Sequence, residues 1–186
     1  PAEDLAYKAV WTPNIYQISL DPNGGNVVEG DLATRTITFG EAYGSLPVME
    51  KENYTFEGWY TDKTGGGKLT ETSAVELGHD HVIYAQYKPI EFTITYYGTE
   101  DAQNDNPETY NVETGLFSLE KASRRGYTFE GWYDNENLEG EEVRAVSANE
   151  TGNKTFYAKW RENHYKIVYH SNEGKGYSKE QQLAYT

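Results

Sequence analysis

The stretch YTFEGWY occurs twice in the chain, at residues 54–60 and again at residues 127–133. The two copies start 73 residues apart, at Tyr54 and Tyr127, and the same offset relates VIYAQY, ending at Tyr87, to TFYAKW, ending at Trp160. It also relates FTITYY at 92–97 to YKIVYH at 165–170. Matches at one fixed offset are the signature of an internal repeat. A repeated unit of this length therefore decides the fold.

Counting outward from the matches divides the chain into four segments. We expect residues 1–13, which contain AYKAVW, to be the closing strand of a preceding repeat. Residues 14–89 form a first complete module and residues 90–162 a second. Residues 163–186 are expected to be the truncated start of a further repeat. The sequence thus predicts two modules within a longer array, with adjacent repeats of the same chain as neighbours.

Each module shows strand patterns with a period of two. YQISL, RTITF, YTFEGWY and HVIYAQY, at 16–20, 35–39, 54–60 and 81–87, alternate apolar and polar residues or are rich in β-branched and aromatic side chains. Strict alternation through YTFEGWY would place Trp59 on the face opposite Phe56. Gly58 and Gly131 lie inside the strands, where glycine usually marks a bulge or a close backbone approach.

One short helix per module is also expected, at residues 41–53 and 115–125. The support is the stretch LFSLEKASRR in the second module, where Leu116, Phe117, Leu119 and Lys121 have a loosely helical spacing. Four or five strands with one short helix in about 75 residues define an α+β, mostly β, module.

Composition excludes several functions. The chain has 186 residues, no Cys and a formal net charge of −14. Lack of Cys excludes disulfides, thiolate zinc sites and a cysteine nucleophile. The negative charge disfavours nucleic acid and anionic membranes, and no apolar run approaches the ~20 residues of a membrane span. Five basic and 11 acidic residues give 14–89 a charge of −6, while seven and 15 give 90–162 a charge of −8.

Two groups of residues could in principle hold a metal ion. His79 and His81 would lie on one side of a strand, but a third ligand is needed and the second module has Gly152 and Lys154 at these positions. We expect a solvated turn there. The acidic stretch at residues 98–108 contains four carboxylates that calcium could use, but it lacks the spacing of an EF-hand loop. We expect a charged hairpin loop, with calcium binding left open. The four carboxylates are Glu100, Asp101, Asp105 and Glu108.

The aromatic residues invite a carbohydrate-binding interpretation, because rings can stack on the CH faces of sugars. They make up 15% of the chain, but most recur at fixed positions within strands, so core packing is the simpler explanation. Tyr43, Tyr110 and Tyr177 are the tyrosines that we expect to be exposed. No paired carboxylates at matching positions and no Ser–His–Asp arrangement indicate catalysis, so we expect no enzyme, no catalytic residue and no cofactor.

The motifs RGYTFEGWY (125–133) and YAKW (157–160) resemble the Listeria–Bacteroides repeat, the B-repeat type found in internalin B. The resemblance covers essentially the whole chain. The first module departs from it with Glu52 and Asn53 before YTFEGWY and with Tyr87 for the usual tryptophan, and the second lacks the NGG turn. The resemblance implies a β-grasp, ubiquitin-like module on an extracellular bacterial surface protein, often one anchored in the cell wall. It implies no catalytic residues.

These observations predict non-catalytic surface modules that act as a semi-rigid spacer, with adhesion to a host or matrix protein or glycan as a possible addition. A dedicated glycan- or protein-binding module that uses surface aromatic residues is the alternative. The strands expected at residues 5–11 and 165–170 would leave open edges, so we also expect that they could pair end to end between molecules.

Overall fold

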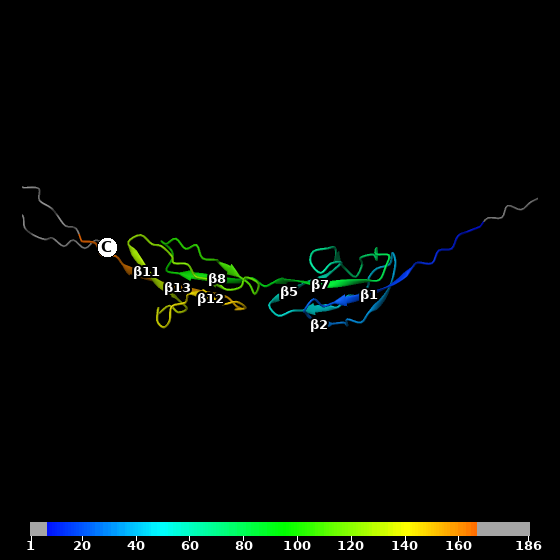
Figure 1. Cartoon of the computed structure of the whole chain (residues 1–186), viewed down its shortest axis with the longest axis horizontal. Coiled ribbons are helices and arrows are strands. Elements are labelled where there is room, and N and C mark those ends of the chain that lie inside the picture. Colours follow the sequence, from blue (N-terminus) through cyan, green and yellow to red (C-terminus); the bar gives the residue numbers. More distant parts are fainter. Residues whose placement is uncertain (1–6, 167–186) are drawn as a thin grey trace, which may run out of the picture. The chain divides into compact units, whose positions relative to one another are not determined.

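The computed structural model describes residues 7–166, and the chain divides into two compact units at Ile90 and Glu91 (Figure 1). The described residues contain strands, turns and bends but no helix. The expectation that the modules are mostly β is therefore confirmed, and each unit is described by itself below.

The first unit is built on a five-stranded mixed sheet. Its strands lie in the order β3-β1-β7-β5-β6, with β1 and β7 parallel and the other neighbours antiparallel. Two further strands, β2 and β4, form a small antiparallel pair of their own. The strands of this unit are β1 (Ile15–Asp21), β2 (Asn26–Glu29), β3 (Arg35–Thr38), β4 (Val48–Glu50), β5 (Tyr54–Tyr60), β6 (Lys68–Leu69) and β7 (His81–Pro89).

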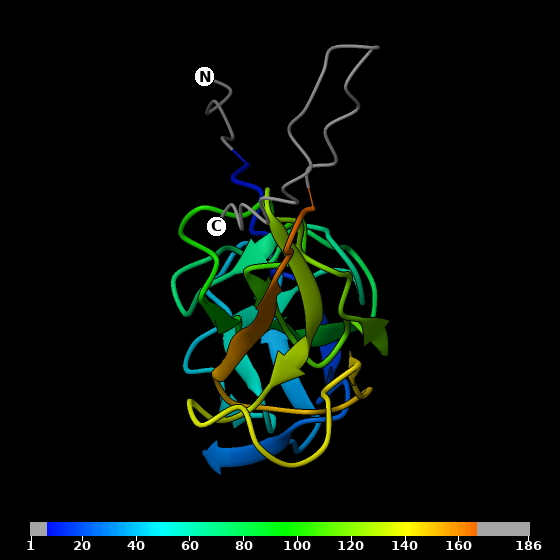
Figure 2. The same ribbon diagram turned by 90° about the vertical axis from the view of Figure 1, so that its left-hand side faces the viewer.

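The second unit repeats this plan with shorter outer strands. Its sheet has the order β11-β13-β8-β9, and again the central pair, β13 and β8, is parallel. Figure 2 shows β13, in orange, beside β11, in yellow-green. The strands are β8 (Phe92–Tyr97), β9 (Thr109–Tyr110), β10 (Phe117–Ser118), β11 (Tyr127–Tyr133), β12 (Ala145–Val146) and β13 (Lys154–Glu162), with β10 and β12 forming a separate pair.

Each unit has its own hydrophobic core on one face of its sheet. Trp59 and Trp132 are the largest fully buried side chains of the two cores. The first core consists of Ile18, Leu20, Ile37, Tyr43, Met49, Trp59, Val75, Ile83 and Ala85. The second consists of Ile94, Tyr110, Leu119, Ala122, Trp132, Val146, Phe156 and Ala158.

A β-bulge interrupts both copies of YTFEGWY, as the internal glycines predict. The pairing register shifts between Phe56 and Gly58 in β5, and between Phe129 and Gly131 in β11. Gly58 and Gly131 have φ angles of 130° and 139°, a region that residues with a Cβ rarely adopt. The bulge interpretation is confirmed, and the glycines are there because the backbone conformation requires them.

The bulge also corrects the expected facing of the tryptophan. Trp59 belongs to the first core and the partly buried Phe56 packs against it, with the two rings edge to face at 6.3 Å. Phe129 and Trp132 do the same in the second unit at 5.1 Å. One extra residue in the bulged strand moves the tryptophan to the core face. Strict alternation through the motif is therefore wrong.

The helix expected at residues 115–125 is not formed, because its backbone groups bond to distant residues. The Leu119 N–H donates to the Arg144 carbonyl at 2.8 Å. The Ser123 N–H donates to the Gln103 carbonyl at 2.9 Å. An α-helix would pair such groups four residues apart. Residues 117–118 form β10 instead, so the prediction from local spacing is wrong.

The helix expected at residues 41–53 is also not formed. Gly44 has a φ of 76°, which is outside the helical region, and Pro47 disfavours a helical conformation in the residue before it. The N–H groups of Tyr43 and Gly44 donate to Ser73 and Glu71 rather than within a local turn. The segment then continues into β4.

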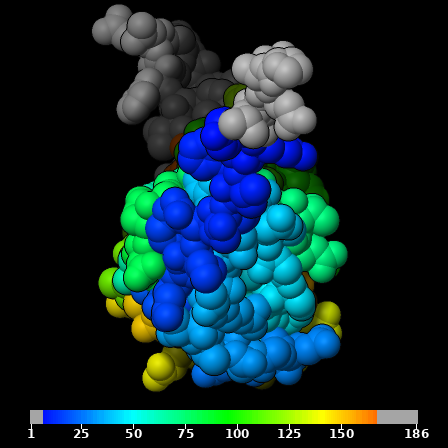
Figure 3. Space-filling view, turned by 90° about the vertical axis from the view of Figure 1, so that its right-hand side faces the viewer, coloured from blue at the N-terminus to red at the C-terminus, as the bar shows by residue number. Residues whose placement is uncertain are grey.

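Residues 7–14 form no strand, and each of them is exposed. Figure 3 shows this segment, in dark blue, on the outside of the first unit. Residues 1–6 and 167–186 lie outside the described residues, so the expectations for 1–13 as a closing strand, for 163–186 as a new repeat and for strand pairing at 5–11 and 165–170 stay predictions.

Candidate functional site

The two histidines singled out in the sequence make ordinary structural contacts. His81 Nε2 lies 2.8 Å from the Tyr43 hydroxyl, and His81 Nδ1 lies 2.9 Å from the His79 carbonyl. Asp80 points elsewhere and accepts a hydrogen bond from the Gln17 N–H. Because both ring nitrogens of His81 have protein partners, His81 serves to hold the start of β7 against Tyr43, and the exposed His79 contributes its backbone carbonyl.

The carboxylates of the acidic stretch at 98–108 do not lie together at one site either. Asp101 forms an ion pair with Arg124 at 3.6 Å, and Asp105 accepts hydrogen bonds from Gln103. Among residues 7–166, no three His, Asp or Glu side chains lie close enough together to hold a metal ion. The same part of the chain contains no helix long and apolar enough to cross a membrane.

Two of the tyrosines expected at the surface are buried. Tyr43 and Tyr110 are 6% and 3% exposed and belong to the two cores. The Tyr110 hydroxyl donates to the Gly152 carbonyl at 2.6 Å. Tyr43 lies inside because its segment is bonded over the core, with the Tyr43 N–H donating to the Ser73 carbonyl, and Tyr110 lies inside because β9 pairs with β8 and turns its ring to the core face. The exposure expected of them is wrong, and Tyr177 lies outside the described residues.

The aromatic side chain near the end of each unit donates a hydrogen bond to a backbone carbonyl of the same unit. Tyr87, at the end of the first unit, donates to the Pro22 carbonyl at 2.9 Å, and Trp160, at the same repeat position, donates from Nε1 to the Gly98 carbonyl at 2.8 Å. Burial, and then Asp21, raises the pKa of Tyr87. Burial, and then Glu108, raises the pKa of Tyr96 to about 12. These phenols stay protonated at neutral pH and act structurally.

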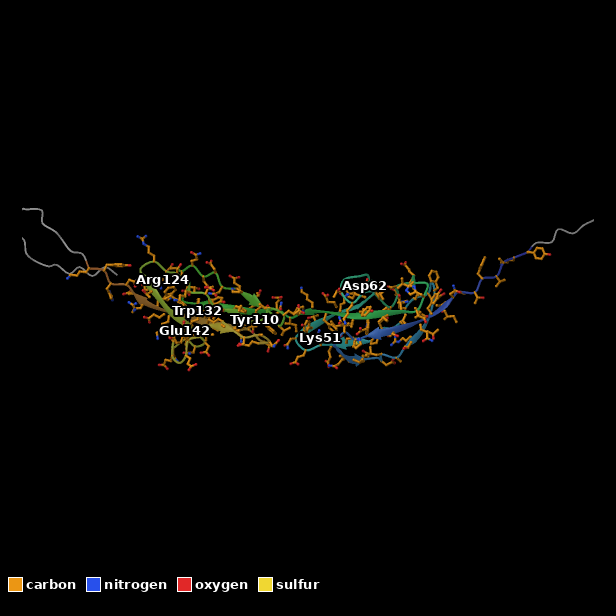
Figure 4. All side chains as sticks on the ribbon, viewed as in Figure 1. Lys51, Asp62, Tyr110, Arg124, Trp132 and Glu142 are labelled. Carbon is orange, nitrogen blue, oxygen red and sulfur yellow. The ribbon has the colours of Figure 1, made fainter. Side chains whose placement is uncertain are left out.

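Cationic side chains cover the first tyrosine of each YTFEGWY copy. The Lys51 ammonium lies 4.2 Å from the Tyr54 ring centroid, and the Arg124 guanidinium lies 4.1 Å from that of Tyr127. Lys51 and Arg124, both labelled in Figure 4, occupy the same repeat position. A cation–π contact of this kind contributes about 0.5–1 kcal/mol at an exposed site. Both units therefore have a cation at this position, and it packs against the tyrosine ring.

The outer face of the second sheet carries three tyrosines side by side. Tyr133 in β11 pairs with Tyr157 in β13, and Tyr157 pairs with Tyr97 in β8. We call these three residues the tyrosine row. The rings of Tyr97 and Tyr157 are stacked, with centroids 5.1 Å apart and planes 18° apart. The core residues Phe156 and Ala158 alternate with Tyr157 in β13, which places the row on the opposite face from the core.

None of the three hydroxyls in the tyrosine row has a hydrogen-bond partner among residues 7–166, in contrast to those of the buried tyrosines. Tyr97 is 49% exposed, and Tyr133 and Tyr157 are partly buried. The Lys159 ammonium lies 5.0 Å from the Tyr133 ring centroid. Sequence reasoning missed this row, because only the cross-strand register brings its members together.

Comparison with known proteins identifies the repeat. A family model described as the Listeria-Bacteroides repeat domain matches residues 16–86 and, separately, residues 92–159. The chain belongs to the Listeria–Bacteroides repeat family. The resemblance carried by RGYTFEGWY and YAKW is thereby confirmed, and one copy of the Listeria–Bacteroides repeat lies in each structural unit.

Two similar proteins show where such repeats occur. A protein of Evansella cellulosilytica named "Putative Gly-rich membrane protein" is 30% identical over 183 residues, which cover 93% of this chain and 20% of that protein. Internalin H of Listeria monocytogenes is 31% identical over 139 residues, which cover 73% of this chain and 24% of internalin H. The chain thus spans only about a fifth to a quarter of the length of these relatives.

Proposed function

We propose that the two Listeria–Bacteroides repeats are non-catalytic spacer modules of a bacterial surface protein. The observation that carries this proposal is the repetition of complete cores: each unit buries its own tryptophan, Trp59 or Trp132, within its own sheet. A module that has a complete hydrophobic core of its own can be repeated many times along a chain, as a stalk requires. No residue is assigned a catalytic or cofactor-binding role.

The link between the two units supports a semi-rigid spacer. β7 ends at Pro89 and β8 begins at Phe92, so only two residues separate the strands. The Ile90 N–H donates to the Asn53 carbonyl at 2.9 Å, and Glu91 accepts from the Asn111 side chain at 2.7 Å. A link this short, with each residue tied to its own unit, restricts independent tumbling of the units.

The same tie occurs after the second unit. The Asn163 N–H donates to the Gly126 carbonyl at 2.8 Å, which is the counterpart of the bond between Ile90 and Asn53 one repeat earlier. Asn53 and Gly126 both have positive φ angles, 63° and 83°. Asparagine tolerates this conformation better than most residues with a Cβ, which explains the departure from glycine in the first unit. We infer that the array continues through the same joint.

We propose an extracellular location at the bacterial cell surface or wall. The names of the two similar proteins, a Gly-rich membrane protein and an internalin, support it. We also propose that each unit is a β-grasp variant in which an extended segment replaces the helix. The mixed sheet with its parallel central pair supports that interpretation.

A deletion in the parent protein on living cells tests the spacer role. Removing residues 14–162 should reduce antibody access to the domains on the distal side of the array, without lowering the amount of protein at the surface. Replacing the same residues with a glycine–serine linker of equal length should restore access only in part, since such a linker is a flexible coil. Unchanged access after the deletion would refute the proposal.

A further inference from the structure

We propose that the tyrosine row of the second unit binds a neutral glycan. This proposal goes beyond the spacer role and does not depend on it. The row consists of Tyr97, Tyr157 and Tyr133, which lie in register on three adjacent strands of the outer sheet face. Adjacent strands are about 4.8 Å apart, so the row crosses about 10 Å of surface.

Packing does not account for the row. Tyrosine usually finds a hydrogen-bond partner when it is buried, and Tyr43, Tyr87 and Tyr110 do so. The hydroxyls of the tyrosine row have no such partner within residues 7–166. The ring of Tyr97 stacks on Tyr157 on one side. On its other side β9 pairs only with Phe92 and Thr93, at the far end of β8, so within residues 7–166 no strand covers the second ring face.

The first unit lacks this arrangement. There, Tyr60 pairs with Tyr84, and Tyr84 pairs with Asp21, so an aspartate occupies the position of Tyr97. Asp21 has a structural task, because its carboxylate accepts a hydrogen bond from the Asn23 N–H in the NGG turn. The second unit has no such turn. The exposed tyrosine is therefore specific to the second unit and is not part of the common repeat design.

The charge of the surroundings excludes an anionic ligand. The second unit carries a net charge of −8. Two cations that alternate with Tyr157 on the same side of β13 are already engaged: Lys159 lies over the Tyr133 ring and donates to the Leu138 carbonyl at 3.3 Å, and Arg161 pairs with Glu130 at 3.0 Å. An anionic polysaccharide or phosphate would thus meet repulsion, and neither of these two cations is free to bind it.

The polarity and size of the row favour a sugar over a lipid or a protein. Free phenol hydroxyls and the neighbouring paired residues Thr95 and Thr155 offer hydrogen bonds beside the open ring of Tyr97. A hexose needs this combination, because its CH face stacks on a ring while its hydroxyls seek polar partners. A stable protein interface needs about 800 Å² per partner, which a row of three rings does not supply.

Titration of the full chain with defined oligosaccharides, followed by amide NMR shifts, tests the proposal. The probes are cellohexaose, maltohexaose and, as the anionic counterpart, hexagalacturonate. We expect at least one neutral hexaose to shift amides of β8 and β13, with weak affinity, and to leave β1 and β7 unchanged. Hexagalacturonate should bind at least about tenfold more weakly, which corresponds to about 1.4 kcal/mol.

Substitutions of Tyr97 supply matched controls. Y97D copies the first unit and should weaken binding at least about tenfold, whereas Y97F keeps the ring and should weaken it less. The NMR spectrum of each variant also reports whether it folds. If Y97D does not fold, Y97S replaces it as the variant without a ring. The proposal is overturned if no neutral hexaose binds at about 10 mM, if a folded Tyr97 variant without a ring binds as well as the unaltered chain, or if only hexagalacturonate binds.

Discussion

The indole Nε1 of Trp59 donates a 2.8 Å hydrogen bond to the Pro47 carbonyl, twelve residues earlier in the chain. Trp132 donates to Glu120 over the same twelve-residue separation and at the same distance. The bond joins the bulged strand to the extended segment that lies where a helix was expected. It gives that segment a fixed position over the core in both units.

Replacing the tryptophans should affect the two units unequally. W59F removes the only side-chain donor to the Pro47 carbonyl within residues 7–166 and leaves a cavity, so we expect a loss of about 3 kcal/mol in unfolding free energy. W132F should cost about 1 kcal/mol less, because the Glu120 carbonyl also accepts from the Asn106 side chain at 2.8 Å. Urea unfolding monitored by circular dichroism measures both.

The exposed Trp11 provides the control for these variants. It is 88% exposed, so W11F should change the unfolding free energy by less than about 0.5 kcal/mol. Losses of the same size for W11F and W59F would show that the indole bond does not hold the extended segment in place.

The bulge glycines should not tolerate even alanine. A Cβ at Gly131 would lie 2.7 Å from Glu142 Cγ, and the φ of 139° is strained for any residue with a side chain (Trp132 and Glu142 are labelled in Figure 4). We expect G131A to lower the unfolding free energy by about 1–3 kcal/mol. Thermal unfolding by calorimetry checks this.

Gly67 is the matched control for Gly131. It has no positive φ, and a Cβ there would come no closer than 3.8 Å to its neighbours. G67A should therefore leave the melting temperature almost unchanged. If G131A were as stable as G67A, the bulge would not depend on glycine.

The repeat and its glycines were predictable from sequence, whereas long-range pairing was not. The 73-residue period indicates two modules, and Gly58 and Gly131 indicate the bulges. The bulge, however, moves Trp59 to the core face, which a count of alternating residues cannot show. The helical spacing of Leu116, Leu119 and Lys121 misled because it describes only local neighbours.

Candidate sites on the surface were harder still to predict. Tyr43 lies in a segment between regular strands and Tyr110 in the two-residue strand β9, and whether each ring faces the core depends on distant hydrogen-bond partners. The tyrosine row depends on the register between three strands. The signal in the sequence was that Thr93, Thr95 and Tyr97 are alternate residues of one strand and so share its outer face. This pattern indicates a row of tyrosines only when β13 is known to pair with β8.

The pair formed by Glu150 and Lys154 predicts a pH effect. The two charged groups lie 2.5 Å apart, and the hydrogen bond from Lys154, followed by that from the Ser147 N–H, lowers the pKa of Glu150 below its ordinary value of 4.5. A carboxyl whose pKa is lowered by folding stabilises the protein above its unfolded pKa, and this contribution is lost as the pH falls through the folded pKa.

We therefore expect E150Q to be less stable than the unaltered chain at pH 7 and equally stable in strong acid. The Glu150 side chain is 36% exposed, so solvent screening keeps the difference at pH 7 below about 1 kcal/mol. Urea unfolding between pH 7 and pH 2 measures it. A difference that stayed constant over this range, or that persisted in a K154Q background, would contradict the ion-pair explanation.

The spacer proposal is tested most directly by small-angle X-ray scattering of the full chain in dilute solution. A semi-rigid pair of modules predicts an elongated particle whose maximum dimension stays the same when ionic strength rises from about 0.05 to 0.5 M, because the short link at Ile90 and Glu91, rather than charge repulsion, sets the geometry. A compact particle with the modules folded back on each other, or one that contracts strongly with salt, would contradict the account.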